Sequence, residues 1–387
     1  MENLYIGRGK DADNATLLAF LDEVFFADDE NDTNFLALLP KIYKDRYRPA
    51  YNNFVVQQPD GVFRAAVGNF DNEMTVGGVD LKTCCIGNVA VGKDFRGKGY
   101  MIDLMNRSVS DMRARGVALS YLGGQRQRYG YFGYENAGTS YLFCFSRRSF
   151  GHSLRKIESG LTVEPLSAGD TDAIRFIDAI YTKAPVISRR PREAYFDILC
   201  SWRDTPYLIK EDGRSVGYAV LTRNLDHVSE FGLADSALLP RFIAALFGMS
   251  DRDEIVFPVA PYEKEKLDFF TKNASALSVG HLESVLVLDW KKVLTAYLNA
   301  KASYETLCDG EITVGIHGRC GDESLRLSVQ NNVARVTEFN GDAAFGMDCL
   351  AAVRAFFSNY PSDRTHFPPE VRQWLPLPMF FSSRDTM

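Results

Sequence analysis

The fold of this 387-residue chain is decided by one stretch, which reads Val89-Ala90-Val91-Gly92-Lys93-Asp94-Phe95-Arg96-Gly97-Lys98-Gly99-Tyr100. Its first residues are apolar and typical of a buried strand, and a loop with closely spaced glycines then leads straight into a helix. Glycines let successive backbone N–H groups face outwards, and with a helix N-terminus behind them these groups form a cradle for a pyrophosphate. The basic residues of the loop add positive charge. Neither the Gly-Lys-Ser/Thr of a P-loop nor a G-x-G-x-x-G dinucleotide motif is present.

The residues around this stretch predict a mixed α/β domain. Helices are expected over 14–26 and 100–115, the second with an apolar stripe of Ile102, Met105, Val109 and Met112. Strands are expected over 53–57, 62–67, 75–81, 84–91 and 117–122, with a turn in the polar run 69–72.

Two motifs in this domain together indicate a family. Arg96-Gly97-Lys98-Gly99 after an apolar strand resembles Arg/Gln-x-x-Gly-x-Gly/Ala, the coenzyme A motif of the GNAT acetyltransferase superfamily, with Met101 in place of the final small residue. Further along, Arg128-Tyr129-Gly130-Tyr131-Phe132-Gly133-Tyr134-Glu135 resembles that superfamily's Tyr-x-x-Phe-Gly-Phe/Tyr signature. The organisation of the whole chain is similar to the enhanced intracellular survival (Eis-like) acetyltransferases.

That resemblance implies a fold of tandem GNAT-like mixed α/β domains followed by a small α+β domain. The expected boundaries are 1–146 for the GNAT domain with the acetyl-CoA site, 147–290 for a degenerate GNAT-like domain, and 291–387 for a sterol-carrier-protein-like domain. In the second domain, the strand predicted over 227–233 leads to Ala234-Asp235-Ser236-Ala237-Leu238, without a glycine loop or basic cluster, so one coenzyme A site per chain is expected. The proline-rich segment 368–378 is expected to run extended.

The resemblance also assigns residues to the donor. Backbone N–H groups around Asn88, Val89 and Val91 would pair with the acetyl-pantetheine, helped by a bulge that opens the sheet. Backbone N–H groups of the loop would hold the pyrophosphate, and the residues concerned are Arg96, Gly97, Lys98, Gly99, Tyr100 and Met101.

Tyr129 matches the family's general acid. A phenol with a reference pKa of about 10 protonates a departing thiolate only when it is well positioned. Tyr131 and Tyr134 are interpreted as packing residues. The family's base is the chain-terminal carboxylate, here that of Met387, and Asp28 falls where the family places an acidic residue near the substrate amine. A solvated loop for 28–32 and a frayed chain end are the alternatives.

Composition sets limits on other classes of function. The chain has 44 basic and 50 acidic residues, a net charge of -6, and a pI near 5.5, so nucleic acid is a poor candidate partner. No apolar run approaches the roughly 20 residues that span a bilayer, and residues 1–14 lack the apolar core of a signal peptide, so a cytoplasmic protein without a membrane partner is expected. Seven cysteines without a C-x-x-C pair and five scattered histidines predict reduced thiols and no metal site.

The leading hypothesis is therefore an acyltransferase: an acetyl-CoA-dependent N-acetyltransferase that acts on primary amines by direct transfer. Aminoglycosides, polyamines and lysine side chains are the amine classes considered, and the resemblance implies a homo-oligomer, a hexamer. Two alternatives stay open. One is an acyl-CoA or lipid carrier with little transferase activity, and the other is an assembly scaffold.

Overall fold

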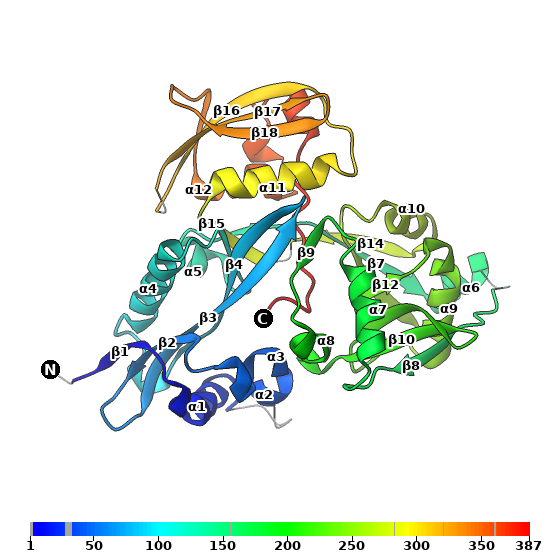
Figure 1. Ribbon diagram of the computed structural model, residues 1–387, viewed down its shortest axis with the longest axis horizontal. Helices are drawn as coiled ribbons and strands as arrows, with labels where there is room; N and C mark the ends of the chain where they lie inside the picture. The colour runs from blue at the N-terminus through cyan, green and yellow to red at the C-terminus, as the bar shows by residue number, and fades with distance from the viewer. Residues whose placement is uncertain (1–2, 28–32, 155–156, 282, 320, 360) are drawn as a thin grey trace. The chain divides into compact units, whose positions relative to one another are not determined.

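The computed structural model describes residues 3–27, 33–154, 157–281, 283–319, 321–359 and 361–387. The chain forms two compact units. Unit 1 consists of Met1–Ala137, Glu283–Leu377 and Thr386–Met387, and unit 2 consists of Gly138–Leu282 and Pro378–Asp385. Each unit mixes helices with sheets, which confirms the predicted mixed α/β class (Figure 1). The three-domain division with boundaries at 146 and 290 stays a prediction.

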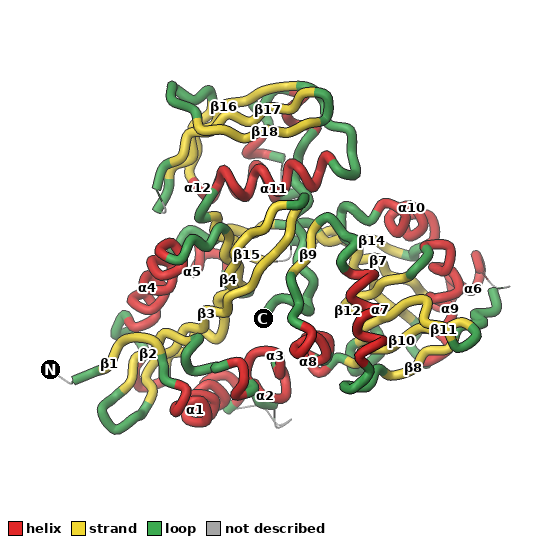
Figure 2. The backbone as a smooth tube through the Cα atoms, viewed as in Figure 1, coloured by secondary structure: helices red, strands yellow, loops and turns green. Residues whose placement is uncertain are grey.

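The main sheet of unit 1 has the strand order β1-β2-β3-β4-β5-β15-β6 (Figure 2). The bounds are β1 (Tyr5–Arg8), β2 (Asn53–Gln57), β3 (Phe63–Val76), β4 (Val79–Val91), β5 (Leu119–Leu122), β15 (Glu283–Val287) and β6 (Glu135–Ala137). Only β4 and β5 run parallel along this path; the other neighbours are antiparallel. The sheet is therefore completed by β15, a strand that follows unit 2 in the sequence.

The predicted strands over 62–67, 75–81 and 84–91 are in fact one long hairpin. β3 and β4 pair from Ala65 and Val91 down to the turn at Gly77 and Gly78, which have φ values of 52° and 77°. The turn expected at 69–72 is wrong, because these polar residues lie inside β3. Residues 69–72 pair with β4 along their whole length, so their backbone groups are satisfied by the ladder.

The helices of the first part of unit 1 are α1 (Asn14–Phe26), α2 (Phe35–Leu38), α3 (Pro40–Tyr43), α4 (Tyr100–Ala114) and α5 (Arg126–Gly130). The predicted α1 and α4 are confirmed. The stripe of α4 is partly wrong, because Met105 and Met112 are fully buried whereas Ile102 is 46% exposed. Near the start of α4, Leu104 is buried instead of Ile102.

Residues 290–377 form a second layered body within unit 1. A sheet of order β18-β17-β16-β19 is combined with helices, and the bounds are α11 (Trp290–Ala302), β16 (Gly310–His317), β17 (Glu323–Gln330), β18 (Val333–Glu338), β19 (Phe345–Asp348), α12 (Cys349–Phe357) and α13 (Pro369–Gln373). The expectation of an extended segment over 368–378 is wrong in part. Pro369 is the first residue of α13, where its missing N–H costs no hydrogen bond.

A buried carboxylate fastens α12 to β6. Glu135 accepts hydrogen bonds from Arg126 Nη2 at 2.6 Å and from Arg354 Nη1 at 2.7 Å. Burial alone would raise the pKa of Glu135, but the two guanidinium groups outweigh it and hold that pKa below its ordinary value. The pairing fixes the body formed by 290–377 to the first part of unit 1.

Unit 2 repeats the strand plan of unit 1. Its strands lie in the order β12-β11-β10-β8 and β13-β7-β14, and a parallel bridge between His227 and Val256 joins the two sets. The bounds are β7 (Ser140–Ser146), β8 (Thr162–Pro165), β10 (Thr205–Glu211), β11 (Arg214–Leu221), β12 (Val228–Leu233), β13 (Glu254–Val259) and β14 (Ala276–Gly280). Here the inserted strand, β7, precedes the others in sequence. In each unit, one strand of the sheet comes from a part of the chain outside the series of consecutive strands: β15 in unit 1 and β7 in unit 2.

The remaining elements of unit 2 are α6 (Arg147–Leu154), α7 (Thr171–Tyr181), β9 (Val186–Ser188), α8 (Tyr195–Leu199), α9 (Leu239–Met249) and α10 (Lys264–Asn273). Its core is rich in phenylalanine: Phe143, Phe145, Phe231, Phe242, Phe257 and Phe270 are buried and pack mainly edge to face. Such ring contacts add stability beyond the area they bury.

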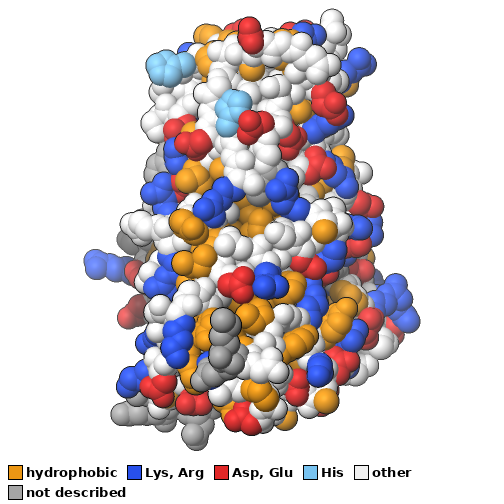
Figure 3. Space-filling model, turned by 90° about the vertical axis from the view of Figure 1, so that its left-hand side faces the viewer, with side chains coloured by type: hydrophobic (Ala, Val, Ile, Leu, Met, Phe, Trp, Pro, Cys, Tyr) orange, Lys and Arg blue, Asp and Glu red, His pale blue; other side chains and the backbone are white. Residues whose placement is uncertain are grey.

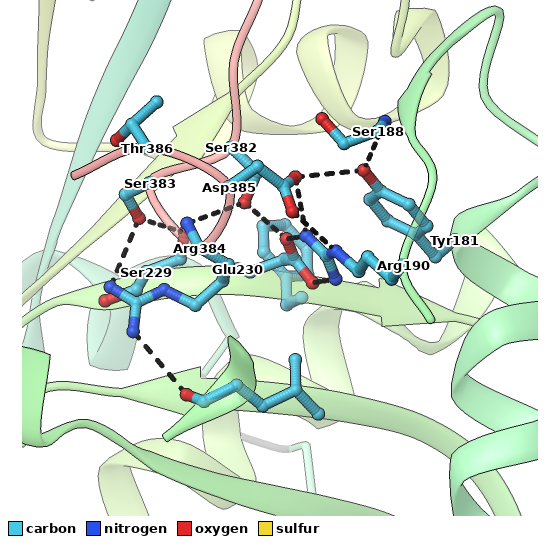
Figure 4. Close-up of polar contacts among 12 residues, drawn as sticks. Tyr181, Ser188, Arg190, Ser229, Glu230, Ser382, Ser383, Arg384, Asp385 and Thr386 are labelled. Carbon is cyan, nitrogen blue, oxygen red and sulfur yellow. Dashed lines mark hydrogen bonds and ion pairs between the residues drawn. The ribbon is translucent and has the colours of Figure 1, made fainter. Parts of the chain in front are cut away.

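Residues 378–385 are tied to unit 2 by a buried ion network (Figure 4). The Arg190 side chain is 1% exposed and donates two hydrogen bonds to Glu230, at 2.8 and 2.6 Å, and two to Asp385, at 2.8 and 2.9 Å. The Tyr181 hydroxyl donates to Asp385 at 3.0 Å, and the Arg190 guanidinium lies 3.8 Å from the centre of the Tyr181 ring. Each charge in this network has partners on more than one side.

We expect Arg190→Met to destabilise unit 2 by about 3–5 kcal/mol, because it leaves Glu230 and Asp385 buried without their counter-ion. Urea unfolding followed by the fluorescence of unit 2's tryptophan, Trp202, measures the change. Arg175→Ala, which removes the exposed pair with Asp172, is the control and should shift the midpoint little. Equal midpoints for the Arg190 variant and the wild type would contradict the assignment.

Candidate active site

The glycine loop adopts the backbone that the sequence predicted. Gly97 and Gly99 have φ values of 78° and 80°, in the left-handed region that L-residues rarely adopt. A Cβ atom at either position would meet no atom within 4 Å, so glycine is required here by the backbone and not by space. Gly99 is the N-cap of α4 and offers no side chain to its first N–H groups. Those groups therefore remain available to an anion.

A pocket of about 680 Å³ opens at this loop. It is lined by Val24, Phe25, Val89, Val91, Phe95, Arg96, Gly97, Lys98, Gly99, Tyr100, Met101, Ile102 and Arg128. These lining residues include three cations and no carboxylate. On the face of unit 1 that carries α4, apolar side chains gather with Lys and Arg side chains around them (Figure 3). An amphipathic polyanion matches this combination of apolar wall, positive charge and helix N-terminus.

Of the residues predicted for donor binding, Val89, Val91 and the run 96–101 line the pocket, and Asn88 is not among its lining residues. The Asn88 side chain is buried and committed elsewhere. Its Oδ1 accepts from the Tyr43 hydroxyl at 2.9 Å, and its Nδ2 donates to Asn53 Oδ1 at 2.6 Å. With a φ of 37°, Asn88 sits at the irregularity of the β3–β4 ladder, so the expected bulge is present.

β4 and β5 part beside this bulge. Their parallel pairing covers only residues 83–85 of β4 and 119–121 of β5. The rest of β4, through Val91, continues to pair with β3. An opening of this kind leaves backbone groups of β4 without a β5 partner, and an extended ligand can pair with them.

Tyr129 lies in α5, the helix that follows β5 in the sequence. It is 7% exposed, and its ring packs against Gly124, where a Cβ atom would be 2.6 Å from Cε2. Burial raises the pKa of the Tyr129 phenol, and the adjacent Arg128 moderates that rise. The phenol therefore carries its proton at neutral pH, as a general acid must.

The two tyrosines interpreted as packing residues differ from one another. Tyr134 is fully buried, and its hydroxyl lies 2.7 Å from Ser120 Oγ. Tyr131 is 53% exposed, with the Arg319 guanidinium 4.2 Å from its ring centre. The packing interpretation holds only in part for Tyr131, because one edge of its ring packs on buried Phe132, with the ring centres 5.0 Å apart, while the rest is exposed.

The chain end lies at the opening between β4 and β5. A side chain at Gly87 would collide with the Met387 thioether, and a Cβ atom at Gly123 would lie 4.0 Å from Met387 O. Lys41 Nζ donates to Thr386 O at 2.6 Å. A Cβ atom built at Gly123 would lie 4.0 Å from Met387 O, and one built at Gly124 would lie 2.6 Å from the Tyr129 ring, so the predicted base and the predicted acid each lie beside one of two consecutive glycines.

Cys85 also borders the chain end. Burial, aided by the nearby Glu283, raises the pKa of its thiol to about 12, and a backbone contact with Met387 opposes that rise. A thiol in this state is not a nucleophile at neutral pH.

Sequence reasoning missed one carboxyl group at this place. Glu283, the first residue of β15, has its Oε2 buried without a hydrogen-bond partner among the described residues, 3.4 Å from a Cβ atom built at Gly123. Burial raises the pKa of Glu283 to about 7, although contacts with Thr386 and Lys41 pull it down. A carboxylate opening an otherwise buried strand was the available signal. Asp28 lies outside the described residues.

The described part of the chain has neither a cluster of metal ligands nor a helix suited to a membrane. It contains no group of three or more His, Cys, Asp and Glu side chains arranged to hold a metal ion. In the same residues, no helix combines the length and apolar character needed to cross a bilayer.

Comparisons with known proteins agree with this geometry. Residues 6–137 match the family model described as "Acetyltransferase (GNAT) domain". A search of curated proteins finds no match.

Among solved structures, a GCN5-related N-acetyltransferase from Anabaena variabilis superposes with a TM-score of 0.69 at 14% identity, covering 99% of this chain and 98% of that one. A conserved protein of unknown function from Enterococcus faecalis, described as a probable N-acyltransferase, gives 0.67 at 14% identity over 92% and 90%. Eis1 from Mycobacterium abscessus gives 0.64 at 14% identity over 99% and 98%.

At such identities the superpositions establish a shared fold, and the activity class comes from the family model. Residues 6–137 form a GNAT acetyltransferase domain, and this chain is an acyltransferase.

Proposed function

We propose that the chain transfers the acetyl group of acetyl-CoA directly to a primary amine. The observation that carries this proposal is that the chain end lies beside Gly123 and the Tyr129 ring lies beside Gly124, close to where β4 and β5 part. A base and an acid on neighbouring residues are what amide formation from a thioester requires.

The pocket supports acetyl-CoA as the donor. The N–H groups at the start of α4 and the side chains of Arg96, Lys98 and Arg128 would hold the phosphates, and the apolar wall formed by Val89 and Val91 would lie along the pantetheine. Bound there, the donor supplies an activated acetyl thioester. The proposed cofactor set contains no metal.

The residues then have distinct tasks. Backbone groups of β4 beyond Cys85 orient the thioester in the opening. The α-carboxylate of Met387 accepts a proton from the amine as its nitrogen forms the new C–N bond. The Tyr129 hydroxyl protonates the sulfur as the C–S bond breaks, so that free thiol leaves.

We propose that unit 2 holds no second donor site. The segment after β12 reaches α9 through a short 3₁₀ helix, Ser236–Leu238, whose N-cap Asp235 accepts a hydrogen bond from the Ala237 N–H at 2.8 Å. This acidic cap satisfies one of the N–H groups ahead of α9, and its negative charge repels an anion.

We expect one coenzyme A site per chain by calorimetry. The double change Arg96→Glu with Gly97→Val should weaken binding by roughly 100-fold or more, because it reverses a charge and strains the cradle. Gly116→Ala is the matched control. Gly116 has a φ of 69° and open space around its Cα, at the other end of α4, so it imposes a similar backbone cost without touching the pocket. Two sites per chain, or unchanged affinity, would refute the assignment.

A second prediction concerns the acid and the base. Tyr129→Phe should lower kcat by roughly 10² while coenzyme A affinity stays unchanged, whereas Tyr131→Phe should be silent. C-terminal amidation by semisynthesis removes the charge of Met387 with almost no change in bulk and should also lower kcat. Full activity of the amidated enzyme from about pH 6 to 9 would eliminate this carboxylate as the base.

The amine class is open to a direct screen. Thiol release from acetyl-CoA, measured with kanamycin, spermidine and an Nα-acetyl-lysine amide, distinguishes the proposed enzyme from a carrier. Turnover with any of them supports the proposal, and displacement of a fluorescent lipid without turnover favours a carrier instead.

Resemblance supports four further proposals: membership of the Eis-like family, a sterol-carrier-like fold for 291–387, a cytoplasmic location and a homohexamer. The last has a simple test, because one chain weighs 43.4 kDa. Light scattering should give six times that mass, and a monomer at micromolar concentration would contradict it.

A further inference from the structure

The Met387 carboxylate leaves one part of the chemistry unexplained. Most primary amines are protonated at neutral pH, because the reference pKa of their ammonium form is about 10. An α-carboxyl group has a reference pKa of about 3.5, so its carboxylate is a weak base toward an ammonium ion. A site with this carboxylate alone would depend on the small fraction of amine that is already neutral.

Glu283 stands at the same place with one oxygen unused. Its Oε2 is buried and lacks a hydrogen-bond partner among the described residues. A single point, the Cβ position built at Gly123, lies 3.4 Å from this oxygen and 4.0 Å from Met387 O. A buried carboxyl oxygen without a hydrogen-bond partner lowers the stability of the fold. A ligand that donates a hydrogen bond to this oxygen would remove that cost.

Four groups in the described part of the chain are found near Glu283. Lys41, from α3, attracts its charged form and is itself bonded to Thr386 O; the Thr386 side chain bonds to the carboxyl group. Cys85, from β4, holds a neutral thiol, and Met387 brings the terminal carboxylate. No arginine is among these groups, in contrast to Glu135.

We propose, on the basis of the proposed amine acetylation, that Glu283 accepts the first proton of the substrate ammonium and so generates the neutral amine that attacks the thioester. The proton balance is complete. Glu283 takes one proton before attack, and the Met387 carboxylate takes the second as the C–N bond forms. Tyr129 gives its proton to the sulfur as the C–S bond breaks and recovers one from the Met387 carboxyl group. Glu283 releases its proton to water, so one proton is produced per amide.

The chemistry of Glu283 is matched to this task. Burial raises the pKa of its carboxyl group to about 7, so both the protonated and the ionised form are present near neutral pH, and the carboxylate is a far stronger base than an ordinary one. The rate should therefore fall as the pH drops below about 7, because Glu283 is then protonated.

The test compares Glu283→Gln with the wild type and with Glu254→Gln, using whichever amine of the panel turns over fastest. Glu254 also opens a strand, β13, but is exposed. At pH 7, Glu283→Gln should lower kcat/KM by roughly 10² or more and leave the coenzyme A Kd unchanged, while Glu254→Gln should match the wild type. The rate of Glu283→Gln should then rise about tenfold per pH unit, since only neutral amine reacts, whereas the wild type stays flat above about pH 7.

A readout without activity comes from stability. In the wild type the folded state holds a proton on Glu283 up to about pH 7, whereas the unfolded chain loses it near 4.5. The native state thus binds more protons in this window, and its stability falls as the pH rises. Glu283→Gln should lack this pH-dependent loss of stability. As the pH rises from about 4.5 to about 7, the urea midpoint of the wild type should therefore fall relative to that of Glu283→Gln.

The outcomes separate the two proposals. A wild type that acetylates none of the amines overturns the proposed function. An active wild type with an unchanged pH profile in Glu283→Gln, or a loss that is equal at every pH, overturns the role of Glu283 alone. If the glutamine variant fails to fold, Glu283→Asp replaces it. That variant keeps a carboxyl group and should retain an acidic inflection at reduced rate, and its absence would count against the proposal.

Discussion

The parting of β4 from β5 is the constraint on which the rest of unit 1 depends. Two parallel strands that stay paired would satisfy each other's backbone groups and leave nothing for a ligand. Here pairing stops after Cys85 and Tyr121, and the irregularity at Asn88 bends β4 away. The buried side chain of Asn88 holds that irregularity through Tyr43 and Asn53. Donor pocket, chain end and Tyr129 all border the gap that results.

Features that rest on local chemistry could be predicted from the sequence. The glycine cradle can be predicted from residues 92–100 alone, because glycines that permit a left-handed backbone stand directly before the residues that begin the helix. The same is true of α1 and α4. The long β3–β4 hairpin was missed for a related reason: the polar run 69–72 resembles a turn locally, and only its pairing with β4 shows that it is a strand.

Features that rest on distant residues were not predictable in this way. Nothing in the sequence of Glu283–Val287 says that this strand enters the sheet of the first 137 residues, between β5 and β6. Glu283 is a site candidate only because that insertion carries it to Gly123. The position of Met387 was anticipated through resemblance, and its contact with Gly87 shows why a residue without a side chain is needed on β4 at that point.

Three glutamates with buried carboxyl oxygens, Glu135, Glu230 and Glu283, show how the surroundings of one side-chain type decide what it can do. Glu135 faces Arg126 and Arg354, and Glu230 faces Arg190; in both, the guanidinium groups outweigh burial and hold the pKa low. Such carboxylates stay charged and form structural ion pairs that join separate elements. Among the described residues, Thr386 and the shared Lys41 oppose the effect of burial on Glu283, and its pKa still rises. A carboxyl group that changes charge near neutral pH is poorly suited to a structural ion pair and well suited to accepting a proton. Of the three glutamates, Glu283 is the one that borders the opening of the sheet.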